Sequence, residues 1–157
     1  MKRVLFVCLG NICRSPAAEG IFQKMIEDAG LEKMISCDSA GTSAYHVGES
    51  ADGRMQEHAQ ERGYELTSLA RQFVETDFIT FDHILTMDPS NWNQVLKLAK
   101  TEEQQAKVYP MTDFCRIHEV SEVPDPYYGG DDGFRLVLDI LEDACSELLD
   151  QLTQELK

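Results

Sequence analysis

Two kinds of apolar pattern alternate along the chain. Short, branched apolar runs typical of strands buried on both faces occupy residues 2–7, 34–38, 83–87 and 107–109. Apolar positions spaced three or four residues apart predict helices over residues 15–29, 51–62, 75–81, 89–98 and from 131 or 132 to about 155. A strand, a helix and a further strand in this order indicate parallel strands joined by right-handed crossovers. The pattern therefore predicts an α/β fold over residues 1–157: a single domain with a four-stranded parallel sheet flanked by helices on both faces, in a doubly wound arrangement.

Residues at the ends of these segments support the predicted boundaries. Ser15 is expected to cap the first helix, with Pro16 at the first helical position, because proline has a helical φ and lacks an N–H that would have no partner there. Ser50 is expected to cap the second helix. Asp88 and Pro89 form a cap and first-position pair at the start of the helix over 89–98, and a helical turn should follow the fourth strand up to residue 115.

The first strand runs through a short loop directly into the first helix, and we name this loop, residues 8–14, the anion loop. Cys8 and Arg14 stand at its two ends, with five residues between them. Backbone N–H groups of such a loop, supported by the positive end of a helix dipole, can surround a doubly charged anion. The residues expected to bind it are Leu9, Gly10, Asn11, Ile12, Cys13, Arg14 and Ser15.

Side chains of the anion loop suggest a nucleophile held beside an anion site. N–H donors and an arginine favour the thiolate, which is the nucleophilic form of Cys8. Arg14 presents a planar fork that matches two oxygens of a phosphoryl group. The Ser15 hydroxyl can donate to the sulfur, Gly10 permits a positive φ or close backbone approach, and Asn11 can tie the loop to its neighbours. The alternative, a buried cysteine at a strand end and a surface arginine, does not account for the strand, loop, Ser-Pro and helix in this order.

A second chemical stretch is Asp125-Pro126-Tyr127-Tyr128-Gly129-Gly130, named the acid loop. Pro126 biases Asp125 towards an extended backbone, and the glycines confine the segment to a loop. The carboxyl of Asp125 can then serve as a general acid and base, and Tyr127 and Tyr128 can stack on an aryl group. On these residues alone an ordinary acidic Asp-Pro turn is the commoner interpretation, and the pairing with Cys8 favours the catalytic one.

Several segments together resemble one known family. The low-molecular-weight protein tyrosine phosphatases carry a signature near the N-terminus, and this chain is similar to it over residues 7–16, VCLGNICRSP. Further segments resemble the family in the family's order, at residues 38–42, 70–72, 81–88 and 125–129. The resemblance implies a small cytoplasmic, metal-free phosphatase with a four-stranded parallel sheet. It also implies that the loop over 42–50, with Tyr45 and His46, helps set specificity. The family often carries a histidine where this chain has Ser68, which leaves open how the hydrogen bonds around Asn11 are closed.

Two further residues near the site each have two interpretations. Ser39 follows the second predicted strand and either hydrogen-bonds Asn11 or belongs to an ordinary strand-end turn. Cys13 either packs within the anion loop or acts as a redox partner that captures oxidised Cys8 as a disulfide.

Composition and charge narrow the partners and the compartment. The chain has 157 residues, 43% of them hydrophobic, which suits one globular domain. A net charge of −14 argues against nucleic acid or an anionic membrane as the main partner. No apolar run approaches the ~20 residues that span a bilayer, and the run after Met1 is too short for a secretory signal. Five cysteines at no framework spacing suggest reduced thiols and a cytoplasmic setting, and the four histidines show no metal-ligand spacing, so we expect no cofactor.

These observations predict a protein tyrosine phosphatase that works through a phosphocysteine on Cys8, with Arg14 binding phosphate and Asp125 as general acid and base. The expected substrates are phosphotyrosine-containing proteins or small aryl phosphates, and the expected inhibitors are phosphate and similar oxyanions. Three alternatives stay open. The first is an arsenate reductase on the same scaffold, which needs a relay of further thiols. The other two are a phosphocysteine carrier and a non-catalytic phosphotyrosine-binding module.

Overall fold

The computed structural model describes residues 1–157 and contains one layer of strands between helices. All pairings in the sheet are parallel, and the strand order is β2-β1-β3-β4. The strands are β1 (Lys2–Cys8), β2 (Ile35–Gly41), β3 (His83–Thr86) and β4 (Val108–Pro110). The prediction of a four-stranded parallel α/β sheet is therefore confirmed.

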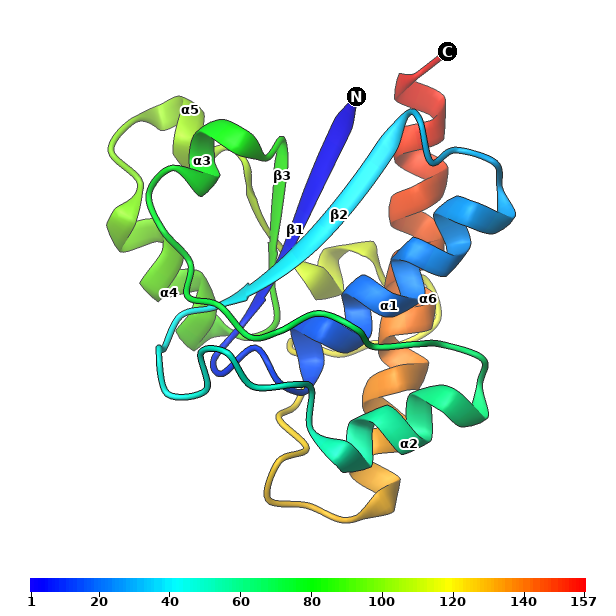
Figure 1. The fold of residues 1–157 in the computed structure, drawn as a ribbon. Helices are drawn as coiled ribbons and strands as arrows, with labels where there is room; N and C mark the ends of the chain where they lie inside the picture. The colour runs from blue at the N-terminus through cyan, green and yellow to red at the C-terminus, as the bar shows by residue number, and fades with distance from the viewer.

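Helices cover both faces of this sheet (Figure 1). One face carries α1 (Arg14–Asp28) and α6 (Asp131–Glu155), with α2 (Gly53–Glu61) packed beside them. The other face carries α3 (Asp77–Thr80), α4 (Pro89–Leu98) and α5 (Glu102–Gln105). A short 3-10 helix, η1 (Met111–Phe114), follows β4, as expected for a helical turn before residue 115.

Alternating side chains of β1 supply the centres of two apolar cores. Val4 and Phe6 belong to the larger core, which is built with α1 and α6. Leu5 and Val7 belong to a smaller core on the opposite face, where they join aromatic residues such as Phe78. The side chains of these four residues are fully buried, which explains why residues 4–7 form an unbroken apolar run in the sequence.

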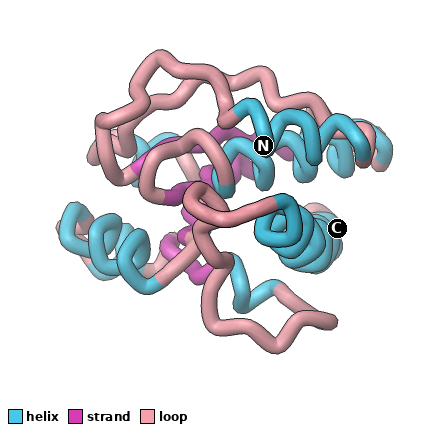
Figure 2. Tube along the Cα trace, turned by 90° about the horizontal axis from the view of Figure 1, so that it is seen from below, coloured by secondary structure: helices cyan, strands magenta, loops and turns pink.

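The carboxyl ends of the parallel strands lie at one edge of the sheet, and both termini lie at the opposite end of the molecule (Figure 1). Seen from the carboxyl-end edge, loops lie across the strand ends (Figure 2). The end of β2 approaches the anion loop so closely that a Cβ on Gly41 would lie 2.8 Å from the carbonyl oxygen of Leu9. This packing holds the anion loop at the position where open α/β sheets bind ligands.

Two predicted helix caps are wrong. Helix α1 begins at Arg14, so Ser15 lies inside the first turn, and its hydroxyl contacts Cys8 Sγ at 3.0 Å instead of capping the helix. Helix α2 begins at Gly53 and is capped by the Asp52 carboxylate, which accepts from two backbone N–H groups of the first turn, while Ser50 lies in an isolated bridge outside the helix. Asp88 does cap α4, with its carboxylate accepting from Asn91 N at 2.8 Å, as predicted.

Other differences concern the extent of the elements. Strand β2 continues to Gly41, so Asp38 and Ser39 lie within the strand, paired with Leu5 and Phe6 of β1, and not at a strand-end turn. Helix α5 is absent from the predicted elements because its four residues are polar and none is buried. None of the helices combines the length and apolar character needed to cross a bilayer.

Candidate active site

The anion loop owes its shape to one residue in the left-handed region. Asn11 has φ +57°, and it is the only non-glycine residue with a positive φ, whereas Gly10 is not among the glycines with a positive φ, so the first of the two roles predicted for Gly10 is not found. The Asn11 amide fixes the turn from both sides: its Nδ2 donates to Ser15 Oγ at 2.7 Å, and its Oδ1 accepts from Arg71 N at 3.0 Å. Gly10 instead allows close approach, since a Cβ there would lie 3.0 Å from His46 Cδ2.

Cys8 lies at the end of β1, 2% exposed, with its sulfur facing the donors of the loop. The backbone N–H of Asn11 donates to Cys8 Sγ at 3.3 Å, and Ser15 Oγ lies 3.0 Å from the same sulfur. A thiolate can only accept, so in that form Ser15 is the donor. Both hydrogen bonds stabilise the charged sulfur that a nucleophile requires.

Arg14 is 2% exposed and its guanidinium is held from two sides. Nη1 donates to Asp88 Oδ2 at 2.6 Å and to the Val123 carbonyl at 3.0 Å, and Nη2 forms an ion pair with Asp125 Oδ2 at 3.6 Å. Burial by itself would lower the pKa of Arg14, but the negative groups beside it raise that pKa above its ordinary value. Arg14 is therefore a fixed positive charge in an otherwise acidic molecule.

The acid loop brings Asp125 to the same place. Asp125 Oδ1 accepts from the backbone N–H of Tyr127 at 3.0 Å, and Oδ2 faces Arg14. The Asp125 side chain is 38% exposed, so solvent reaches it. The structure thus brings the predicted nucleophile, cation and acid together, although 117 positions separate Cys8 from Asp125 in the sequence.

A cavity of about 180 Å³ joins the two loops. Cys8, Arg14 and Asp125 line it, and so do the predicted rim residues Tyr45, His46, Tyr127 and Tyr128. Tyr45 and Tyr128 are 88% and 93% exposed, so they stand at the mouth of the cavity and not within its walls. Asn11 and Ser15 lie behind the lining, where they hold the loop.

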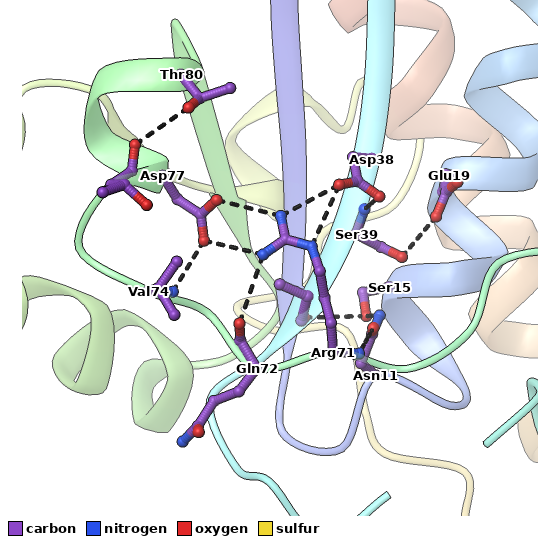
Figure 3. Close-up of polar contacts among 12 residues, drawn as sticks. Asn11, Ser15, Glu19, Asp38, Ser39, Arg71, Gln72, Val74, Asp77 and Thr80 are labelled. Carbon is purple, nitrogen blue, oxygen red and sulfur yellow. Dashed lines mark hydrogen bonds and ion pairs between the residues drawn. The ribbon is translucent and has the colours of Figure 1, made fainter. Parts of the chain in front are cut away.

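The expected hydrogen bond between Ser39 and Asn11 is absent, which corrects that prediction. Ser39 Oγ donates to Glu19 Oε1 at 2.5 Å, while both ends of the Asn11 amide are occupied by Ser15 and Arg71 (Figure 3). Ser39 therefore supports α1 through Glu19 and reaches the anion loop only indirectly.

Arg71 completes the hydrogen bonds around Asn11 in this chain, which has Ser68 where the family often has a histidine. The Arg71 guanidinium lies between Asp38 and Asp77, bonded to both carboxylates at 3.1–3.2 Å, and this fixes the backbone N–H that Asn11 accepts (Figure 3). Burial raises the pKa of Glu19 above its ordinary value, and hydrogen bonds from Ser39 and Ser68 oppose that rise only in part.

All five cysteines are free thiols. Cys13 lines the cavity with Cys8, and burial, followed by the charge of Asp52, raises the pKa of its thiol. Cys37, Cys115 and Cys145 lie away from the cavity lining. No group of three or more histidine, cysteine, aspartate or glutamate side chains is arranged to hold a metal ion.

Sequence patterns missed several residues of the site. Asp88 was identified only as a helix cap, and its second role, holding Arg14, depends on a contact across 74 positions. Asp52 and Arg54 at the start of α2 and Arg71 beyond it are also part of the site's support. Arg71 and Asp88 lie in segments that resemble the family, at residues 70–72 and 81–88, and Asp52 and Arg54 left a local signal, two opposite charges at the start of a helix.

Fold and site together define an α/β protein with a buried cysteine in an anion loop at the carboxyl end of its central strand. The family model described as low molecular weight phosphotyrosine protein phosphatase matches residues 3–157. A chain from Synechocystis sp. is 52% identical over 154 residues, 98% of each chain, and the low molecular weight protein-tyrosine-phosphatase of Streptomyces coelicolor is 41% identical over 157 residues, 99% of this chain and 96% of that one. The crystal structure of a protein tyrosine phosphatase from Entamoeba histolytica is similar with a TM-score of 0.96 and 46% identity, covering 100% of both chains. The chain belongs to the low molecular weight phosphotyrosine protein phosphatase family.

Proposed function

We propose that this protein, as one phosphatase domain over residues 1–157, hydrolyses phosphotyrosine through a covalent intermediate on Cys8. The observation that carries the proposal is the meeting of three groups at one cavity: the Cys8 sulfur, the Arg14 fork and the Asp125 carboxyl. These are the nucleophile, the charge-stabilising group and the proton donor that transfer of a phosphoryl group requires.

The first step forms a sulfur–phosphorus bond and breaks the bond between phosphorus and the ester oxygen. Anion-loop N–H groups and Arg14 bind the phosphoryl oxygens as negative charge spreads over them. Asp125 gives its proton to the departing phenol oxygen and becomes a carboxylate. Ser15, 3.0 Å from Cys8 Sγ, donates to the sulfur before the attack.

The second step returns the enzyme to its starting state. The Asp125 carboxylate takes a proton from a water that attacks phosphorus, the sulfur–phosphorus bond breaks, and inorganic phosphate leaves. The Ser15 hydroxyl and the Asn11 N–H stabilise the thiolate that departs. The partial exposure of Asp125 leaves room for that water.

The cavity supports aryl phosphates over phosphoserine as substrates. Cys8 is buried, and aromatic side chains stand at the mouth, so a phosphate on a long, flat aromatic stem suits the site. Phosphotyrosine-containing proteins and small aryl phosphates are the proposed substrates, and phosphate and similar oxyanions the proposed inhibitors. The related Entamoeba histolytica structure holds Hepes in its active site.

Five free thiols support the proposal of a cytoplasmic setting, and a redox role for Cys13 stays a prediction.

Arrangement of the thiols disfavours an arsenate reductase, because Cys37, Cys115 and Cys145 do not line the cavity and so offer no relay beyond Cys13. A phosphocysteine carrier or a binding module has no use for an acid beside the departing oxygen, whereas Asp125 lies at the cavity, paired with Arg14.

Initial rates of hydrolysis test the proposal directly. We expect turnover of phosphotyrosine, with or without a chelator, much slower turnover of phosphoserine, and no turnover by Cys8→Ser. Full activity in Cys8→Ser would refute the proposal. Reduction of arsenate with a thiol reductant, at a rate exceeding phosphotyrosine hydrolysis, would favour the reductase instead.

A further inference from the structure

The first turn of α2 touches both loops of the active site. The backbone N–H of Asp52 donates to the Ile12 carbonyl of the anion loop at 2.8 Å. The Asp52 carboxylate caps α2 and holds the Arg54 guanidinium, with Arg54 Nε at 3.2 Å and Nη2 at 3.1 Å. Burial would raise the pKa of Asp52, but these hydrogen bonds lower that pKa below its ordinary value, so the carboxylate stays charged.

From there, Arg54 reaches the acid loop. Its Nη2 donates to the backbone carbonyl of Tyr127 at 2.8 Å. The guanidinium carbon lies 5.5 Å from the centroid of the Tyr127 ring and 4.9 Å from that of Phe134, within the range of cation–π attraction. Arg54 thus contacts the backbone and the ring of one acid-loop residue, and anchors both to the start of α6.

Tyr127 in turn orients the general acid. Its backbone N–H donates to Asp125 Oδ1 at 3.0 Å, and its carbonyl accepts from Arg54. The only other polar contact of the Asp125 carboxyl is the 3.6 Å ion pair with Arg14. Without Arg54, the Tyr127 carbonyl loses its hydrogen-bond donor, and the Tyr127 ring keeps its contacts with His46, Tyr128 and the larger core.

We propose that Arg54 is a positioning residue for Asp125, held by Asp52 and linked through the Asp52 N–H to the anion loop. This inference rests on the proposed function, because it assigns to Arg54 the task of placing the proposed general acid. The link from Ile12 to Asp52, Arg54 and Tyr127 sets the distance between the group that holds phosphate and the group that protonates the leaving oxygen.

The test compares substrates that need the acid to different extents. Tyrosine, with a pKa of ~10, is a poor leaving group that needs protonation, whereas the more acidic p-nitrophenol leaves without much help. In Arg54→Gln we expect kcat/KM, which reports the steps up to departure of the phenol, to fall about tenfold for phosphotyrosine, a part of the ~10²-fold or more that a positioned acid contributes. For p-nitrophenyl phosphate we expect kcat/KM to fall less than about twofold. Arg54→Lys should restore part of the loss, since it keeps the charge but not the fork.

Controls separate positioning from general damage. Arg135→Gln removes another exposed arginine near the start of α6, whose guanidinium pairs with Asp132, and should leave both rates unchanged. Thermal unfolding should show that Arg54→Gln is folded at the assay temperature. In an Asp125→Asn background, Arg54→Gln should cause no further loss of kcat/KM for phosphotyrosine, because the group that it positions is absent.

Three results would overturn the inference. They are equal losses for both substrates, an undiminished loss in the Asp125→Asn background, and full activity of Arg54→Gln on phosphotyrosine. If Asp125→Asn alone hydrolyses phosphotyrosine at the wild-type rate, the proposed acid itself is wrong and the inference fails with it. If Asp125→Asn is slow and Arg54→Gln is not, only the inference fails.

Discussion

The anion loop and the acid loop face the same cavity but are held in opposite ways. Cys8, Asn11 and Arg14 are each 2% exposed and Ser15 is fully buried, with every polar side chain bonded to another part of the protein. In the acid loop, Asp125 is 38% exposed at its side chain, and its carboxyl makes only two polar contacts.

This difference matches two different tasks. Stabilising a spreading negative charge requires donors that are already in place, because reorganising them during the reaction costs free energy. A general acid and base must instead meet leaving groups of several shapes and then a water molecule, which requires access. In the proposed mechanism, the rigid anion loop stabilises charge and the accessible acid loop transfers the proton.

Breaking the anion loop should have the largest effect. In Arg14→Lys we expect kcat/KM to fall by ~10²–10³ for phosphotyrosine and p-nitrophenyl phosphate alike, because lysine cannot offer two parallel donors to the phosphoryl oxygens. Steady-state kinetics measure this loss, and Arg3→Lys on the exposed part of β1 is the matched control. Activity within twofold of wild type in Arg14→Lys would contradict the assigned role.

Breaking the acid loop should cost less and should depend on the leaving group. In Asp125→Asn we expect kcat/KM, which reports the steps up to departure of the phenol, to fall by ~10²-fold for phosphotyrosine and by less for p-nitrophenyl phosphate, since the amide cannot supply a proton. Asp132→Asn, at a fully exposed position shortly after the acid loop, should change neither rate. Equal losses on the two substrates would show that Asp125 does not protonate the leaving group.

The segment before the acid loop is anchored by a buried carboxylate on α6. Asp143 accepts from the backbone N–H groups of Arg116, Ile117 and His118 at 2.9–3.0 Å, and although burial would raise its pKa, these hydrogen bonds lower the pKa to about 2. A carboxyl with a lowered pKa stabilises the fold above its unfolded pKa of ~3.9, and this contribution disappears as the pH falls towards the folded pKa.

In Asp143→Asn we therefore expect the free energy of unfolding at pH 7 to fall by about 2–3 kcal/mol, with a smaller difference from wild type below about pH 4. Urea denaturation at several pH values measures it. Asp150→Asn, which removes an exposed ion pair with Arg116, should cost less than about 1 kcal/mol. A difference that does not shrink in acid would mean that the charge of Asp143 is not what anchors the segment.

Glu19, which supports the anion loop through Ser39, has a pKa shifted in the opposite direction from that of Asp143. Burial raises the pKa of Glu19, so the contribution of Glu19 to stability is fully present below its unfolded pKa and is lost as the pH rises through its folded pKa. In Glu19→Gln we expect a small gain in the free energy of unfolding at pH 8 that vanishes near pH 4. Denaturation curves for Glu19→Gln and for the exposed control Glu32→Gln measure it, and a loss of stability at pH 8 would contradict this sign.

The sheet and the two chemical loops could be predicted because their signals are local. Strands buried on both faces leave unbroken apolar runs, and Cys8, Arg14 and Asp125 lie in short stretches with distinctive neighbours. Helix caps were less predictable, because the Ser15 hydroxyl has a better partner in Cys8 than in its own helix.

Contacts between distant segments left no signal in the sequence. The bond from Arg71 N to Asn11 crosses 60 positions and the bond from Arg54 to Tyr127 crosses 73, so their partners are fixed only once the sheet has formed. Ser39 was misplaced for the same reason, since its true partner Glu19 becomes adjacent only when α1 packs beside β2.

The most direct test of the account is to catch the intermediate. Asp125→Asn is mixed with p-nitrophenyl phosphate, quenched rapidly in acid and analysed by peptide mass spectrometry. The leaving group departs without the acid, whereas release of phosphate still needs the base, so a phosphoryl group should accumulate on the peptide that contains Cys8. Release of p-nitrophenol with Cys8 unmodified, or with the phosphoryl group on another residue, would contradict the account.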